Sequence, residues 1–183
     1  ANGGQESSLV VDNQRNVHIV WRGIYYKHSL PPAITISGAP LLGSTINITL
    51  SDSLNPNAQY ILAMSLGITP GIPLSGNRTI PLNPDAVLLQ SLMNPVALGL
   101  FNAQNVLNAS GQASAYWAIP NIQELGGITI YLAFVTINPA LPLPQAIMSI
   151  SPAREITILS VSERNRQYTV DNFTAALWHF NEE

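Results

Sequence analysis

Short apolar or alternating runs fill the middle of this chain, and Gly, Pro, Asn or Ser interrupts them about every ten positions. Runs this short leave no room for long helices and are typical of a β-sandwich or barrel. Ile46, Ile48 and Leu50 alternate with polar residues, as in a strand with one face in water. We therefore predict an all-β fold: an antiparallel β-sandwich, Ig-like or jelly-roll-like, with at most one short helix.

The rest of the sandwich is predicted from the same kind of pattern. Besides residues 45–50, strands are expected at residues 33–37, 60–66, 112–119, 128–136, 147–150 and 155–159. Frequent Pro and Gly residues predict an ordered loop at residues 68–84. Residues 85–92 fit either a short helix, with Asn83 as its cap and Pro84 in its first turn, or a buried strand.

The two ends of the chain differ from the middle and are predicted to be strand-forming extensions. We divide the chain into an N-terminal β-hairpin extension at residues 1–30, the sandwich at residues 31–159 and a C-terminal extension at residues 160–183. Residues 9–21 fit a hairpin around a polar turn, followed by a third strand at residues 24–26.

The C-terminal extension has two open interpretations. Residues 168–170 favour a strand. Phe173, Ala176, Leu177 and Phe180 have helical spacing instead. Propensity does not decide between the two.

Charged residues are scarce in the middle of the chain. Only four lie within residues 31–150, namely Asp52, Arg78, Asp85 and Glu124. Because a soluble domain usually carries roughly a quarter charged residues, this surface must be wetted by amides and hydroxyls or covered by protein, sugar or lipid. The net charge of −3 and a single lysine, Lys27, argue against a nucleic-acid partner. No apolar run reaches the ~20 residues of a membrane span.

Composition also bears on chemistry and location. The chain has no cysteine, which excludes thiolate catalysis and Cys-ligated metals. It begins at Ala1 without an initiator Met, which fits a chain trimmed after a signal peptide and equally fits a piece of a longer one. We expect a secreted protein, extracellular or at the cell surface.

No catalytic constellation is evident, and we expect no enzyme activity. His18, His28 and His179 all lie in the end segments. Asp52 and Asp85 lie in turn-like contexts, where an Asp most often caps or bonds its own backbone. Calcium is the one cofactor considered, because Asp52, Asn55 and Asn57 could offer oxygen ligands, although their spacing is not that of an EF-hand.

Two kinds of sugar-related residue are candidates. The glycosylation pattern Asn-x-Ser/Thr begins at Asn47, Asn77, Asn108 and Asn172. Exposed aromatic rings stack on sugars, and the candidates are Tyr26 and Trp117. Tyr116 and Trp117 are adjacent in a predicted strand, so they point to opposite faces and one of them belongs to the core.

Several phrases of the middle segment carry a resemblance to a known kind of module. They are Ile34 to Gly38, Leu42 to Ile46, Leu66 to Leu74, Arg78 to Asp85, Leu107 to Ala113 and Ile130 to Thr136. In this order they resemble an uncharacterised β-rich module found near the C-termini of secreted bacterial proteins, notably of planctomycetes. The resemblance covers about residues 31–159 and implies an extracellular accessory domain without assigned catalytic residues.

A shorter resemblance lies in residues 9–28. It is similar to one strand pair of a sialidase-type propeller blade. A propeller needs several blades around an axis, and this chain offers one, so we interpret the segment as an ordinary hairpin.

These observations predict a non-enzymatic, self-assembling subunit of an extracellular fibre or surface layer. A terminal segment would add to the open sheet edge of a neighbouring copy. The expected interface residues are Leu9, Val11, Val17, Ile19, Trp21, Tyr168, Val170, Trp178 and Phe180. The alternative is a carbohydrate-binding accessory module, with glycans as partners.

Overall fold

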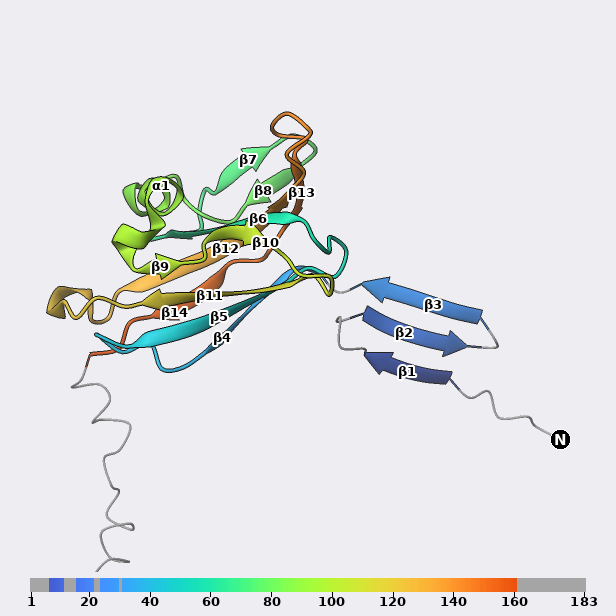
Figure 1. The fold of residues 1–183 in the computed structure, drawn as a ribbon, viewed down its shortest axis with the longest axis horizontal. Helices are drawn as coiled ribbons and strands as arrows, with labels where there is room; N and C mark the ends of the chain where they lie inside the picture. The colour runs from blue at the N-terminus through green and yellow to red at the C-terminus, as the bar shows by residue number, and fades with distance from the viewer. Residues whose placement is uncertain (1–6, 12–15, 22–23, 30, 161–183) are drawn as a thin grey trace, which may run out of the picture.

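The computed structural model describes residues 7–11, 16–21, 24–29 and 31–160. Within these ranges the protein is mostly β, with several antiparallel sheets and one α-helix, which confirms the predicted all-β, sandwich-like fold (Figure 1). Within the same ranges, no helix has the length and apolar character needed to cross a membrane.

Two sheets form the sandwich. The four-stranded sheet has the order β4-β5-β11-β9, made of β4 (Ala33–Ser37), β5 (Thr45–Ser51), β11 (Gln112–Ala118) and β9 (Leu100–Phe101). The five-stranded sheet has the order β10-β6-β12-β13, with β14 also paired to β12. Its strands are β6 (Gln59–Ser65), β10 (Gln104–Val106), β12 (Thr129–Ile137), β13 (Ile147–Ile150) and β14 (Arg154–Thr157).

The main core lies between these two sheets. Ile46, Ile48 and Leu50 of β5 are fully buried, as their alternation predicts, because every second residue of the strand faces the core. They belong to one cluster with the inward residues of the five-stranded sheet, which are Tyr60, Leu62, Met64, Ile130, Leu132, Phe134 and Ile156. Burial raises the pKa of the Tyr60 hydroxyl, which donates a hydrogen bond of 2.8 Å to the Asn102 carbonyl.

A third layer covers the other face of the five-stranded sheet. It consists of the hairpin β7 (Ile72–Leu74) and β8 (Arg78–Ile80), the helix α1 (Ala86–Met93), and the connection from β12 to β13 (Figure 1). Two short 3₁₀ helices, η1 (Pro95–Leu98) and η2 (Gln123–Leu125), complete the fold. The central strands β6 and β12 are therefore covered on both faces.

The N-terminal segment forms a three-stranded sheet of its own, in the order β1-β2-β3. Its strands are β1 (Ser7–Val11), β2 (Asn16–Trp21) and β3 (Ile24–Ser29). This confirms the predicted hairpin and third strand. The predicted strand or helix of the C-terminal extension lies outside the described residues.

The region 68–92 corrects two details of the sequence interpretation. The predicted loop contains the hairpin β7-β8, in which Ile72 pairs with Ile80. The short helix is present, but its N-cap is Asp85 rather than Asn83: the Asp85 backbone is extended, and Oδ1 accepts a hydrogen bond of 2.8 Å from Leu88 N. Asn83 accepts a bond from Gly71 N instead.

Candidate functional site

The most distinctive hollow of the described structure lies on the outer face of β6 and β12. Ala63 and Ala133 stand directly opposite each other in the register of the two strands, and both line this hollow. Ile61 and Val135 are the next opposing pair along the same face. Both alanines are buried and pack in one cluster with Leu82 and Leu88, and their small side chains leave space beside this cluster that larger side chains would fill.

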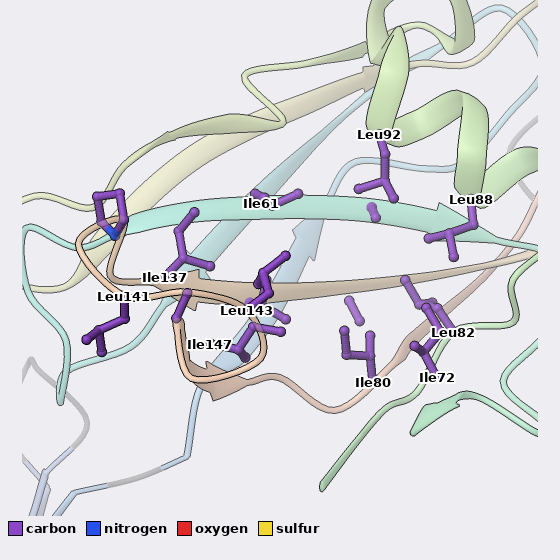
Figure 2. A pocket seen from close by; sticks show the side chains of 15 residues that line it. Ile61, Ile72, Ile80, Leu82, Leu88, Leu92, Ile137, Leu141, Leu143 and Ile147 are labelled. Carbon is purple, nitrogen blue, oxygen red and sulfur yellow. The ribbon is translucent and has the colours of Figure 1, made fainter. Parts of the chain in front are cut away.

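The walls of this pocket come from all three covering segments. They are Leu88 and Leu92 of α1, Ile72, Ile80 and Leu82 of the hairpin region, and Pro139, Leu141, Leu143, Ala146 and Ile147 of the β12–β13 region. Figure 2 shows these side chains converging over the sheet. The pocket measures about 430 Å³, and its fifteen lining side chains are all hydrocarbon.

The β12–β13 connection is fixed by hydrogen bonds. The guanidinium of Arg78 in β8 donates two hydrogen bonds, one of 2.6 Å to the carbonyl oxygen of Ile147 and one of 3.4 Å to that of Pro144. Within the connection, Asn138 N donates to Ala146 O at 2.8 Å. Because charge-assisted bonds are stronger than neutral ones, Arg78 ties the connection and the hairpin into one roof.

The helix is fixed to the sheet by a buried hydroxyl. Ser91 is fully buried, and its Oγ accepts a bond of 3.1 Å from Met64 N while donating 2.8 Å to Leu88 O. Gln104 Nε2 adds a bond of 3.0 Å to Leu92 O. Backbone groups of β6 that a neighbouring strand would otherwise satisfy are bonded by α1 instead.

The carboxylate of Asp85 joins the start of α1 to the end of β6. It accepts bonds of 2.8 Å from Leu88 N, Ser65 Oγ and Leu66 N. Burial opposes ionisation, but these bonds and one from Val87 N outweigh it and lower the pKa of Asp85 below its ordinary value. The helix that forms one wall of the pocket is thus anchored at its first turn.

Two of the three residues considered for calcium, Asp52 and Asn55, are bonded to each other within the fold. Asp52 is 1% exposed, and its carboxylate accepts bonds from Leu54 N (3.3 Å), Asn55 Nδ2 (2.8 Å) and two hydroxyls. Asn55 therefore turns its amide nitrogen, not its oxygen, to the carboxylate, and both oxygens of the Asp52 carboxylate already accept hydrogen bonds. Within the described ranges, no three His, Asp or Glu side chains gather as a metal site would require.

The sugar-stacking candidates separate in the structure. Trp117 is 3% exposed, lies in the main core and donates from Nε1 to Leu98 O at 3.0 Å, so it cannot stack on a ligand. Its neighbour Tyr116 is 38% exposed and stacks on Phe101 at 4.7 Å between ring centroids. Tyr26 belongs to β3, but its side chain is not among those that the structure describes.

Three of the four glycosylation candidates lie on the surface. Asn47 is exposed on β5, Asn77 is exposed in the β7-β8 turn with φ of 57°, and Asn108 is exposed in the turn before β11. The Asn108 side chain accepts bonds of 2.9 Å from Ser110 N and Gln112 N. Asn172 lies outside the described residues. Glycosylation stays a prediction.

The predicted interface residues fall into two groups. Leu9, Val11, Val17, Ile19 and Trp21 belong to β1 and β2, where Leu9 pairs with Ile19 and Val11 with Val17; Leu9 is 65% exposed. Tyr168, Val170, Trp178 and Phe180 lie outside the described residues.

Sequence reasoning missed the pocket, although a signal for it was present. Residues 128–137 form a nearly continuous apolar run, unlike the strict alternation of β5. Continuous runs are typical of strands covered on both faces. This run therefore indicated a third layer, whereas the position of the hollow depends on tertiary packing.

Comparisons with known proteins leave the family open. No family model matches the chain, and no curated protein matches it. Among solved structures, it is similar to a DUF4466 family protein from Parabacteroides merdae, with 10% identity over 69% of this chain and 43% of that one, so the chain spans less than half of that structure. The TM-score is 0.29, which is too low to support an inference about fold or function. The resemblance to the planctomycete module and the extracellular location stay predictions.

Proposed function

We propose that this chain is a non-enzymatic binding module that holds an apolar group in the pocket between the five-stranded sheet and its roof. The supporting observation is the lining, in which all fifteen side chains are hydrocarbon. Such a wall offers nothing to the hydroxyls of a sugar or the backbone of a peptide, which would lose their hydrogen bonds to water. A hydrocarbon group loses nothing there and gains contact area.

The pocket is large enough for a ligand, and exposed apolar side chains stand at its mouth. Protein interiors are close-packed, and a volume of about 430 Å³ falls in the range of ligand sites. Leu141 and Leu143 line the pocket and are 47% and 75% exposed, so they add apolar surface at its mouth. An apolar ligand would restore the dispersion contacts that these side chains lack.

Filling the floor tests this function. Ala63→Leu is expected to weaken binding of the neutral dye Nile red at least about tenfold, because the larger side chain occupies the hollow. Dye fluorescence during titration measures the affinity. Ala133→Val adds less volume to the same floor and should therefore reduce Nile red affinity by a smaller factor.

The matched control is Ala97→Leu, which makes the same change at an exposed position of η1 away from the pocket. It should leave dye affinity unchanged. If Ala63→Leu folds normally and binds the dye as the wild type does, the pocket is not the site. A wild-type protein that does not bind Nile red would also exclude the proposal.

A second candidate function is self-assembly by strand addition, and the edge strand β4 favours it. Among the described residues, β4 pairs with β5 alone, and it carries no charge and no proline. Natural proteins usually protect an exposed edge with charged residues or proline, so a five-residue edge that has neither is suited to pairing with a second copy.

Two lysine variants test this assembly. Thr35 on β4 and Thr49 on β5 are exposed and directly opposite each other. Thr35→Lys should weaken self-association about tenfold or more, because its charge would adjoin the added strand, whereas Thr49→Lys should change it little. Sedimentation velocity over a concentration series measures both. Monomeric wild-type protein at high concentration would contradict assembly.

A further inference from the structure

The floor of the pocket changes from apolar to amide-lined at one end. On β6, Gln59 lies two residues before Ile61 and therefore on the same face of the strand, and it pairs with Ile137 of β12. Ile61 and Ile137 line the pocket and also a neighbouring hollow with Gln59, Gln104 and Asn105. The pocket thus continues into polar surface at this end.

A second hollow adjoins the same end. It shares Ile137 and Pro139 with the pocket, and its polar residues are Asn55, Asn57, Gln59 and Asn138. No residue that lines the pocket or either of these two hollows is charged. The rim at this end is therefore polar through amides alone, and we call it the amide rim.

The opposite end of the pocket is apolar and anchored. Leu82 and Leu88 are almost completely buried there, 1% and 5% exposed. Figure 2 shows them at the far side of the pocket from Ile137 and Leu141. Behind them, the bond from Ser65 to Asp85 fixes the end of β6 to the start of α1.

On the basis of the proposed function, we propose that the pocket binds the single hydrocarbon chain of an amphiphile whose head group is polar but uncharged. The tail lies over Ala63 and Ala133, and the head lies at the amide rim beside Gln59. Amides donate and accept hydrogen bonds, so they suit hydroxyl, amide or sugar head groups. A carboxylate or ammonium head would lose hydration at this rim without gaining a countercharge.

Three amphiphiles with the same tail test the head-group preference. We would titrate the full chain, below micelle-forming concentrations, with decyl maltoside, decanoate and decyltrimethylammonium, and follow the displacement of Nile red. Decyl maltoside should bind about tenfold more tightly than either charged amphiphile. Ala63→Leu should reduce its binding, which shows that the tail enters the pocket.

A charge placed at the rim tests the orientation. Gln59→Lys should raise decanoate affinity about fivefold or more and lower that for decyltrimethylammonium, because the ammonium would lie beside the head group. Gln123→Lys introduces the same charge on η2, away from the rim, and should alter neither affinity.

The outcomes separate the two proposals. Decanoate binding as tight as that of decyl maltoside, or an unchanged decanoate affinity in Gln59→Lys, would overturn the head-group assignment while dye binding still supports the pocket. If neither Nile red nor any amphiphile binds, the proposed function itself fails, and the assignment fails with it.

Discussion

Replacing Asp52 by alanine is expected to lower the free energy of unfolding by about 4 kcal/mol. Its carboxylate accepts hydrogen bonds from Thr136 Oγ1 at 3.1 Å and from Ser149 Oγ, and the two hydroxyls are 2.6 Å apart. Thr136 belongs to β12 and Ser149 to β13. One side chain therefore joins the turn after β5 to two strands of the other sheet.

The size of the effect follows from burial. Asp52 and Thr136 are 1% and 0% exposed, so water does not replace a lost bond there. Removing the carboxylate leaves the buried Thr136 hydroxyl to the Ser149 hydroxyl 2.6 Å away and takes the shared acceptor from four donors at once, so the expected loss exceeds that of a single hydrogen bond. Asp52→Asn keeps the shape and one acceptor oxygen, and we expect roughly half the loss.

Urea unfolding measures these losses, with Glu124→Ala as the matched removal of an exposed carboxylate. That control should change stability by less than about 0.5 kcal/mol. A loss below about 1 kcal/mol for Asp52→Ala would show that the carboxylate does not hold the two sheets together.

The charge distribution of the chain has a structural explanation that its sequence did not reveal. Three of the four charged residues in the middle segment are engaged in internal bonds: Asp52 between the sheets, Arg78 between β8 and the β12–β13 connection, and Asp85 at the start of α1. Glu124 is the one of the four whose side chain lies exposed on the surface. The sequence predicted a surface with few charges. That the charged side chains form internal hydrogen bonds could be seen only in the tertiary structure.

The predictability of each strand depended on how many of its faces are covered. β5 was predictable because one face is wet and its residues alternate strictly. The pair Tyr116 and Trp117 could be recognised as one inward and one outward residue, but only packing against Ile46 and Leu100 decides which one is buried. The local sequence shows that side chains alternate between the two faces of a strand, and tertiary contacts decide which face is buried.

The hairpin β7-β8 was missed because its residues are typical of a loop. Pro73 lies within β7, and Gly76 with a φ of 74° forms the turn. Both strands of a two-stranded sheet are edge strands, where proline is tolerated because its missing N–H can face away from the partner strand. Ile72 and Ile80 line the pocket, so their positions depend on packing against residues distant in the sequence. Such packing leaves no pattern in the local sequence.

Gly99→Ala is the second substitution for which we expect a large effect, a loss of at least about 3 kcal/mol. Gly99 ends η1 with a φ of 76°, and its carbonyl accepts a bond of 2.9 Å from Ala118 N. A side chain at this position would overlap the Ala118 carbonyl oxygen, which is backbone and cannot rotate away. The adjacent Leu98 carbonyl accepts the Trp117 indole, so a displaced η1 would also disturb the core.

Gly76→Ala separates the two contributions to that loss. Gly76 has nearly the same backbone conformation, with φ of 74°, but nothing within 4 Å of an added side chain. It should therefore lose only the roughly 1 kcal/mol of a left-handed non-glycine residue. The difference in urea unfolding free energy between the two variants then measures the steric conflict alone. Equal losses would mean that η1 can shift freely, and that its contact with β11 does not position the core tryptophan.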